Sequence, residues 1–292
     1  GSRSTARAEQ FADTYDMPHA YGSYTDLVGS GAVDAVYIAT PHPFHAEQAL
    51  QCIAAGVPVL VEKPFAMTAA EADTVAAAAR EAEVFAMEAM WTAFIPAVQQ
   101  ALAQVEANTI GPISTVRADL SARRSFDASS RLYDPELGGG VLLDLGVYAV
   151  WWAHRLLGSP ESSTATATIG QTGVEESLTA TLTYPDEQKA VLTASFREQG
   201  TQLAHVTGSD GTLRLHAPWW HSAKLSLTGR DIPTETREHS FQGHGYHFEA
   251  AHVQQCVEDG RTESPVLPLD ESVAVMRTLD TLREACGLSP WG

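Results

Sequence analysis

Short apolar runs alternate with longer helical stretches in the first third of the chain. The pattern predicts three strands, at residues 35–39, 57–61 and 84–89. One helix is expected from Phe44 to Ala55, where Gly56 stops it, and another from the capping-box sequence Thr68-Ala69-Ala70-Glu71 to about Ala82. Strands that alternate with helices are typical of βαβ units, so this part predicts a parallel sheet with helices on its faces.

Beyond Gly111-Pro112, strand-like segments follow one another directly. They lie at about residues 113–121, 162–169, 177–184, 189–196, 202–207, 211–217 and 223–228. A strongly apolar helix from about Val141 to Leu157 interrupts them, and helices at about 245–258 and 270–286 end the chain. The whole pattern predicts an α/β chain: a Rossmann-like dinucleotide-binding domain over residues 1–110, then an α+β domain over residues 111–292 with a large, mainly antiparallel, open-faced sheet. The last helix is expected to pack back on the first domain.

Composition and charge exclude several classes of protein. The 292 residues carry a formal charge of −18, which repels phosphate backbones and anionic lipid headgroups, so nucleic acid and membranes are excluded as partners. The apolar stretches are too short to span a bilayer, and the chain does not open with a secretory signal. Three widely spaced cysteines suit reduced thiols, so we expect a cytoplasmic protein.

Candidate chemistry first appears at the ends of two predicted strands. Thr40-Pro41-His42 follows the first strand and Glu62-Lys63-Pro64 follows the second. Because ligands of parallel sheets bind beyond the carboxyl ends of the strands, both segments should face one crevice. The spacing alone leaves open whether Lys63 belongs to a site or is a solvated lysine paired with Glu62.

A second group of candidates lies on the apolar helix that Gly138-Gly139-Gly140 precedes. Asp144 and Tyr148 stand four residues apart, so both should leave the same face of a buried helix. A buried Asp144 needs a cation or a donor. An ammonium group near Tyr148 would lower the pKa of the phenol, and Lys63 is the candidate for it. The alternative is a core tyrosine bonded to a structural aspartate.

Four motifs in this order resemble the glucose-fructose oxidoreductase/inositol dehydrogenase/MocA (Gfo/Idh/MocA) family. They are Glu62-Lys63-Pro64, Met87-Glu88-Ala89-Met90-Trp91, the glycine-rich entry with Asp144, Gly146 and Tyr148, and Tyr246-His247-Phe248-Glu249-Ala250 through Glu263-Ser264-Pro265. The second and fourth motifs, and Tyr148 where inositol dehydrogenases carry histidine, are most similar to the branch of dimeric dihydrodiol dehydrogenases and NADP-dependent D-xylose dehydrogenases. The resemblance runs from residue 1 to about residue 287.

The resemblance implies an oxidoreductase that moves a hydride between a nicotinamide and a secondary alcohol or carbonyl of a sugar, polyol or cyclic diol. Lys63 would bond the reacting hydroxyl, Tyr148 would transfer its proton, and Asp144 would orient them. Trp91, Phe126 and Tyr246 would wall the substrate pocket. The cofactor-binding residues would be Ser2, Arg3, Ser4, Thr40, Pro41, His42, His45, Glu62, Lys63 and Trp91.

The cofactor expected from these residues is NADP(H) rather than NAD(H). Family members that prefer NAD usually carry an acidic residue at the end of their second strand, where this chain has Ser2-Arg3-Ser4. A planar guanidinium group with hydroxyl neighbours suits a 2′-phosphate. The first strand and the Gly-rich phosphate loop of the family should precede Arg3 and do not occur in this sequence; we expect them upstream.

Two rival functions fit parts of the sequence. Histidine pairs such as His42-x-x-His45 and His244-x-x-His247 suggest a metal-dependent hydrolase, but neither pair has further ligands at zinc spacing, so no metal site is expected. A non-catalytic dinucleotide- or sugar-binding protein would also fit the fold. A binding protein has no need of an acid/base pair such as Lys63 and Tyr148, which favours an enzyme.

The second sheet also carries a prediction about assembly. Leu213, Leu215, Leu225 and Leu227 recur at period two, and leucines on an open sheet face would form an apolar patch too large for a stable monomer. Family members commonly pair through this sheet, which implies a homodimer or a dimer of dimers. In the alternative, the leucines face inward while Arg214, His216, Lys224 and Ser226 face water.

Overall fold

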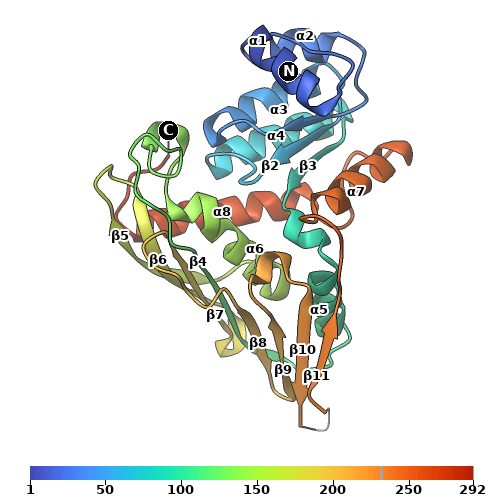
Figure 1. The fold of residues 1–292 in the computed structure, drawn as a ribbon. Coiled ribbons are helices and arrows are strands. Elements are labelled where there is room, and N and C mark those ends of the chain that lie inside the picture. The colour runs from blue at the N-terminus through green and yellow to red at the C-terminus, as the bar shows by residue number, and fades with distance from the viewer. Residues whose placement is uncertain (231–232, 292) are drawn as a thin grey trace.

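The three predicted strands of the first sheet are confirmed. The computed structural model describes residues 1–230 and 233–291, and Figure 1 shows their fold. Strands β1 (Val36–Ile38), β2 (Val59–Glu62) and β3 (Ala86–Ala89) lie parallel in the order β1-β2-β3. Helices α3 (His45–Ala54) and α4 (Ala69–Ala82) connect them, and the Thr68 hydroxyl caps α4 by accepting a hydrogen bond from the amide of Glu71. The carboxyl ends of β1 and β2 therefore lie side by side, as expected.

Two further helices lie on the far side of β1. They are α1 (Thr5–Tyr15) and α2 (Tyr24–Gly29). A cavity of about 670 Å³ separates them from β1, which is the edge strand of the described sheet, and apolar side chains of all three elements line much of it. The described edge of β1 thus borders an apolar groove.

The second sheet has eight strands among the described residues and is mainly antiparallel, as predicted. In chain order they are β4 (Ile113–Ser121), β5 (Ser162–Ile169), β6 (Glu175–Thr183), β7 (Lys189–Ser195), β8 (Ala204–Gly208), β9 (Gly211–Leu215), β10 (Lys224–Gly229) and β11 (Glu235–Glu238). The spatial order is β11-β10-β9-β8-β4-β7-β6-β5, and the central pair β4 and β7 is parallel. The edge strand β11 was not predicted, because all four of its residues are exposed and give no apolar signal.

Helices cover one face of this sheet. They are α5 (Pro96–Glu106), α6 (Val147–Leu157) and α8 (Leu269–Ala285), while α7 (Tyr246–Glu258) lies beside the first sheet. Short 3₁₀ turns lie at His42–Phe44, Trp91–Phe94, Pro135–Leu137, Pro185–Glu187 and Trp219–His221. No helix in the described part of the chain combines the length and apolar character that crossing a bilayer requires.

The leucines of the last strands lie on the covered face, so the predicted apolar patch is wrong. Leu213, Leu215 and Leu225 are each 2% exposed and Leu227 is 7% exposed, because α5 packs over β9 and β10. Their neighbour Arg214 faces water instead. Alternation at period two places residues on two faces without saying which face is covered, and this is why the prediction failed.

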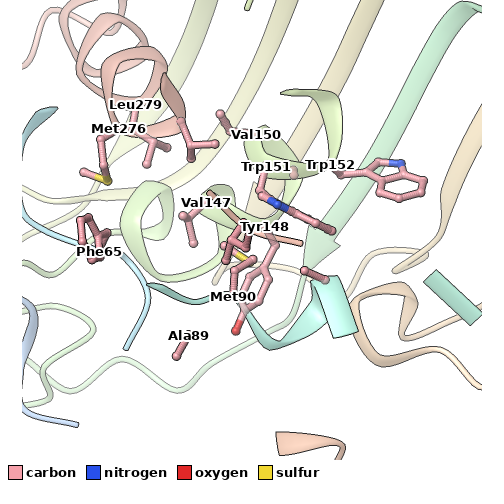
Figure 2. Close-up of a cluster of buried hydrophobic side chains, with 14 of the residues drawn as sticks. Phe65, Ala89, Met90, Val147, Tyr148, Val150, Trp151, Trp152, Met276 and Leu279 are labelled. Atoms are coloured by element: carbon pink, nitrogen blue, oxygen red, sulfur yellow. The ribbon is translucent and has the colours of Figure 1, made fainter. Parts of the chain in front are cut away.

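The hydrophobic core is continuous between the two sheets. Figure 2 shows Met276 and Leu279 of α8 close to Val147 and Val150 of α6, with Phe65 from the first half of the chain beside them. Helix α8 also reaches α4, where the Asp280 carboxylate accepts a hydrogen bond of 2.9 Å from the amide of Ala69. The last helix therefore packs on both halves of the molecule. All three cysteines are free thiols.

Candidate functional site

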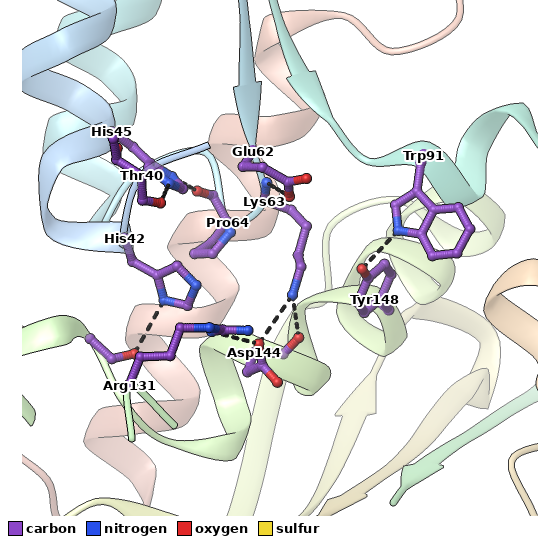
Figure 3. A network of polar contacts seen from close by, with 11 residues as sticks. Thr40, His42, His45, Glu62, Lys63, Pro64, Trp91, Arg131, Asp144 and Tyr148 are labelled. Carbon is purple, nitrogen blue, oxygen red and sulfur yellow. Dashed lines mark hydrogen bonds and ion pairs between the residues drawn. The ribbon is translucent and has the colours of Figure 1, made fainter. Parts of the chain in front are cut away.

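Lys63 crosses from the first sheet to the helix of the second. Its Nζ donates a hydrogen bond of 2.6 Å to the backbone carbonyl of Asp144 and lies 3.4 Å from the Asp144 Oδ1 (Figure 3). Glu62 turns away from the ammonium group: it accepts hydrogen bonds from the Lys63 amide and from the Tyr37 hydroxyl. Lys63 is therefore paired with Asp144 and not with Glu62.

Asp144 is buried between two cations. Besides Lys63, the guanidinium group of Arg131 donates a hydrogen bond of 3.1 Å to Oδ1, and Asp144 is only 7% exposed. Burial alone would raise the pKa of this carboxyl, but Lys63 and Arg131 hold it at about 2. The expected cationic partner is present. Arg131 was missed, because it lies in an irregular loop with no spacing that relates it to Asp144.

The predicted helix from Val141 to Leu157 begins with a π-helical segment, Leu142–Gly146, and α6 follows it. Asp144 thus lies in the π-helical segment and Tyr148 in α6, and the Lys63 ammonium group lies near both side chains. The start of this helical segment requires glycine at position 140. Gly140 has a φ of 119°, and a Cβ atom there would collide with the carboxylate of Glu175. That carboxylate accepts a hydrogen bond of 3.1 Å from the amide of Leu142, which fixes the start of the helix.

The phenol of Tyr148 is bonded to Trp91 and not to Asp144. The Trp91 indole Nε1 donates a hydrogen bond of 2.8 Å to the Tyr148 oxygen, and the Lys63 Nζ lies 4.9 Å from the centre of the phenol ring. Burial raises the pKa of Tyr148 well above its ordinary value of 10.0, an effect that the Trp91 hydrogen bond partly offsets. The predicted lowering of this pKa toward neutral pH is therefore not seen in this structure, in which burial has the largest effect and the ammonium group of Lys63 is bonded to Asp144.

Aromatic rings extend the site on the other side of Trp91. Tyr246 stacks on Trp91 with ring centres 4.4 Å apart, and His221 stacks on it at 5.5 Å. Tyr246 is 47% exposed, so its ring forms an accessible wall of the site. Trp91 connects this ring to Tyr148, because it stacks on Tyr246 and donates a hydrogen bond to Tyr148. The structure thus brings together Trp91 and Tyr246, as the resemblance implied. His221 was not predicted, since a histidine after a pair of tryptophans has no distinctive pattern.

The segment after β1 lies against the same crevice. His42 is 6% exposed and its Nδ1 lies 3.2 Å from the carbonyl oxygen of Gly138, the start of the glycine run. His45 is fully buried, with its ring nitrogens 2.8 Å from the carbonyl oxygens of Thr40 and Pro64. Burial lowers the pKa of both imidazoles, that of His42 to about 3, so His42 is neutral at physiological pH; for His45 the two hydrogen bonds to carbonyl oxygens act against burial. Across the described ranges, no three His, Cys, Asp or Glu side chains converge as a metal site.

The residues at the start of the chain divide into structural and accessible ones. The Ser4 hydroxyl caps α1 by accepting a hydrogen bond from the amide of Arg7, and the amide of Ser2 donates to the carbonyl of Tyr21. Arg3 is exposed, and its guanidinium carbon lies 5.4 Å from the centre of the Phe44 ring, directly after His42 and Pro43. Arg3 therefore presents a cation near the carboxyl end of β1.

Two buried carboxyl groups behind the site were missed. Glu88 on β3 is 1% exposed and accepts a hydrogen bond of 3.0 Å from the amide of Phe65, in the loop after Lys63. Glu249 on α7 is 2% exposed, and one oxygen of each carboxyl has no hydrogen-bond partner among the described residues. Burial raises the pKa of Glu88 to about 7 and that of Glu249 to about 9, with Glu62 adding to both. Glutamates within a strand and a helix gave no sign of such burial.

Phe126 lies away from these residues. Its ring is 46% exposed, packs edge-to-face on Tyr133 at 5.0 Å, and lines a cavity whose described lining contains none of Lys63, Tyr148 and Trp91. The structure does not bring Phe126 into the predicted pocket wall. The loop after β4 points it outward, while Arg131 of the same loop reaches Asp144.

Comparison with known proteins identifies the family. An oxidoreductase family with an NAD-binding Rossmann fold matches residues 1–90, and a GFO/IDH/MocA C-terminal domain matches residues 98–214. Trans-1,2-dihydrobenzene-1,2-diol dehydrogenase of Homo sapiens is 35% identical over 295 residues, covering 99% of this chain and 88% of the human protein. The same enzyme of Bos taurus is 36% identical, with coverage of 99% and 88%.

Solved structures agree in fold. The aldose-aldose oxidoreductase of Caulobacter crescentus superposes with a TM-score of 0.86 at 23% identity, over 98% of this chain and 88% of that one. KijD10, a 3-ketoreductase of Actinomadura kijaniata in complex with NADP and TDP-benzene, superposes with a TM-score of 0.85 at 25% identity, over 97% and 88%. The chain belongs to the Gfo/Idh/MocA family of NAD(P)-binding oxidoreductases, and over nearly its whole length it is similar to dihydrodiol dehydrogenases.

Proposed function

We propose that this protein interconverts a secondary alcohol of a sugar, polyol or cyclic diol with its carbonyl, using NADP(H), with Tyr148 as the acid/base and Lys63 as its partner. The observation that carries the proposal is the meeting of Lys63, Asp144 and Tyr148 beside the carboxyl ends of β1 and β2. The relatives' names point to the same class of substrate: diols for the mammalian enzymes, aldoses and a keto group for the structural neighbours.

Lys63 is suited to bind the reacting oxygen. An ammonium group has three donors, and two of its directions are taken by the carbonyl and the carboxylate of Asp144. The remaining donor is available for a hydroxyl or carbonyl oxygen. Asp144 keeps its charge near Lys63 and holds the ammonium group in place, which makes Asp144 a positioning residue.

Tyr148 is suited to donate the proton. Tryptophan Nε1–H can only donate, so the Tyr148 oxygen accepts from Trp91 and its own O–H proton is free to point to a substrate. The raised pKa keeps the phenol protonated in the protein without ligands, which is the state that donates a proton in carbonyl reduction. In the reverse direction the same oxygen takes the proton from the alcohol.

The residues around the crevice fit a nicotinamide dinucleotide. The carboxyl ends of β1 and β2 present Thr40, His42 and Glu62 at the place where such ligands bind in parallel sheets, and the buried His42 is neutral. When bound, the cofactor supplies or accepts the hydride at its nicotinamide ring. Arg3 supports NADP(H) over NAD(H), because an exposed guanidinium near the end of β1 can pair with a 2′-phosphate.

We also propose that the family's first strand pairs with the open edge of β1. The apolar groove between α1, α2 and β1 has room for it, and a strand there would place a phosphate loop next to Thr40.

We further propose a homodimer, or a dimer of dimers, that forms through the second sheet. The interface of this dimer would be the sheet face that no described helix covers. The buried leucines of β9 and β10 are not part of it. The cytoplasmic location stays a prediction.

Kinetics of the full-length protein test the proposal. Titration of NADPH fluorescence measures cofactor binding, and turnover of diols and aldoses measures catalysis. Replacing Tyr148 by Phe, or Lys63 by Ala, should lower kcat by about 10² or more, the usual scale for an acid–base group. NADPH affinity should change far less for Tyr148→Phe. A Tyr148→Phe enzyme with near wild-type turnover on its best substrate would contradict the assignment.

A further inference from the structure

A second cavity lies beside the large sheet, next to the end of β4. It has a volume of about 830 Å³, within the usual range for small-molecule sites. The loop after β4 forms one side, the turn after β5 forms another, and the starts or ends of β6 and β7 form the floor. Its lining residues are Arg123, Arg124, Ser125, Phe126, Tyr133, Ile169, Gly170, Gln171, Glu176, Phe196 and Arg197.

The floor of this cavity is held by regular backbone hydrogen bonds. The amide of Arg124 donates to the carbonyl of Phe196 and the amide of Phe196 donates to the carbonyl of Glu176, each at 2.8 Å. These bonds continue the pairing of β4, β7 and β6 past the ends of the strands. The side chains of Arg124 and its neighbours therefore stand on an extension of the sheet and not on an unsupported loop.

Three guanidinium groups face this cavity against a single carboxylate. Arg197 donates a hydrogen bond of 3.0 Å to Glu176, whereas the exposed guanidinium groups of Arg123 and Arg124 have no side-chain partner among the described residues. The chain as a whole carries a formal charge of −18. A local excess of positive charge in such a protein attracts anions to this place.

An aromatic ladder forms the apolar part of the lining. Tyr133 packs edge-to-face on Phe126 at 5.0 Å and on Phe196 at 5.7 Å. Phe196 and Tyr133 are buried, while Phe126 is 46% exposed and Ile169, across the cavity, is 43% exposed. Exposed rings and branched side chains that line a cavity provide a surface for a flat apolar body.

We propose that this cavity binds a small organic anion: a carboxylate or phosphate group held by Arg123 and Arg124, on a ring that packs against Phe126 and Ile169. Guanidinium forks bind both kinds of anionic group in pairs of hydrogen bonds. The site is separate from Lys63 and Tyr148 and does not depend on the function proposed for them.

Binding of defined probes to the full-length protein tests this site. By calorimetry, 1-naphthoate and phenyl phosphate represent a carboxylate and a phosphate on a ring, while 1-naphthol and inorganic phosphate each lack one of the two features. We expect at least one ring anion to bind with a Kd below about 1 mM, and both partial probes to bind at least about tenfold more weakly, the effect of losing one charged contact or the ring packing. Equal binding of 1-naphthol, or of inorganic phosphate, would overturn the proposal.

Substitutions test where in the molecule the probe binds. Arg123→Gln/Arg124→Gln should weaken the ring anion at least about tenfold, since it removes both unpaired guanidinium groups. Arg261→Gln/Arg277→Gln, which removes two exposed arginines elsewhere, should leave the Kd unchanged. Lys63→Ala should also leave it unchanged. Loss of binding in Lys63→Ala would show that the probe binds at the other site. Unchanged binding in the Arg123/Arg124 variant would also exclude this cavity. Circular dichroism checks that each variant is folded.

Discussion

The indole nitrogen of Trp91 donates a hydrogen bond of 2.8 Å to the phenol oxygen of Tyr148, and both side chains are at most 6% exposed. A donor at this oxygen stabilises the phenolate and so lowers the pKa of Tyr148 against the effect of burial. Trp91 is held in turn by its stacking on Tyr246. An aromatic wall of the pocket thus also sets the acidity of the residue that we propose as the proton donor.

Trp91→Phe should therefore shift the pH profile of the reaction. The phenylalanine keeps a ring but loses the donor, so the pKa that Tyr148 contributes to the kcat profile of alcohol oxidation should rise, and kcat of oxidation near neutral pH should fall about tenfold, the worth of one hydrogen bond. The measurement is kcat against pH from about 6 to 10. Tyr246→Phe keeps the Trp91 hydrogen bond and is the matched control. If both variants have the wild-type pH profile, Trp91 acts only as a wall.

Arg3→Ala should weaken NADPH selectively. Loss of a charge-assisted hydrogen bond to the 2′-phosphate costs about 1.5–3 kcal/mol of binding free energy, while NADH has no such phosphate and should bind nearly as before. Fluorescence titration with both cofactors measures the difference. Arg7→Ala, which removes an exposed arginine on α1, is the control for charge alone. Equal losses for NADPH and NADH would exclude a 2′-phosphate contact.

Glu249 should make the protein less stable as the pH rises. Its pKa is about 9 in the folded chain against an ordinary value of 4.5, so between these values the folded state holds a proton that the unfolded state has lost. The free energy of unfolding then falls with rising pH, by at most about 1.4 kcal/mol per pH unit for one group. Glu249→Gln removes this contribution, so the variant should lose less stability than the wild type between pH 6 and pH 8.

Urea unfolding at the two pH values gives the comparison. Glu258→Gln, at the exposed end of the same helix, should keep the wild-type dependence. The remaining slope of Glu249→Gln is expected from Glu88, whose pKa of about 7 acts in the same direction. A Glu249→Gln variant with the full wild-type slope would show that its carboxyl is ionised in the folded protein.

Light scattering at micromolar concentration should give the mass of a dimer or of a dimer of dimers. Val191 lies on β7, in the centre of the sheet, next to the exposed Arg117 of β4. Val191→Glu places a charge in the middle of the proposed interface and should shift the mass toward that of one chain. Thr74→Glu on the exposed face of α4 should not. A wild-type mass equal to one chain would refute the dimer.

The sequence predicted those parts of the site that follow from the ends of strands. Lys63 and His42 end neighbouring parallel strands, and parallel strands bring their carboxyl ends to one edge whatever the loops do. The proximity of Asp144 to a cation also followed, because an apolar helix cannot bury a lone carboxylate. These inferences use only local pattern and the cost of burial.

Other features of the site and of the second sheet depend on tertiary packing, which local sequence patterns do not indicate. Arg131 reaches Asp144 from an irregular loop, and a π-helical segment stands at the start of the predicted helix before α6 begins. Which face of β9 and β10 is covered depends on where α5 packs. The burial of Glu88 on β3 and of Glu249 on α7 depends on the elements that pack around them. Each of these needed the arrangement of elements far apart in the chain.

The position of helix α8 near residue 285 determines when the core of the first half can be covered during synthesis. This helix covers the first half of the molecule through Met276 beside Phe65 and through the hydrogen bond from Ala69 to Asp280, yet it leaves the ribosome well after the residues that it covers. During synthesis the nascent cofactor half therefore has an uncovered apolar surface until residues near 285 emerge. A chain whose translation stops before α8 exposes that surface, and cellular quality control can recognise it before any active site exists.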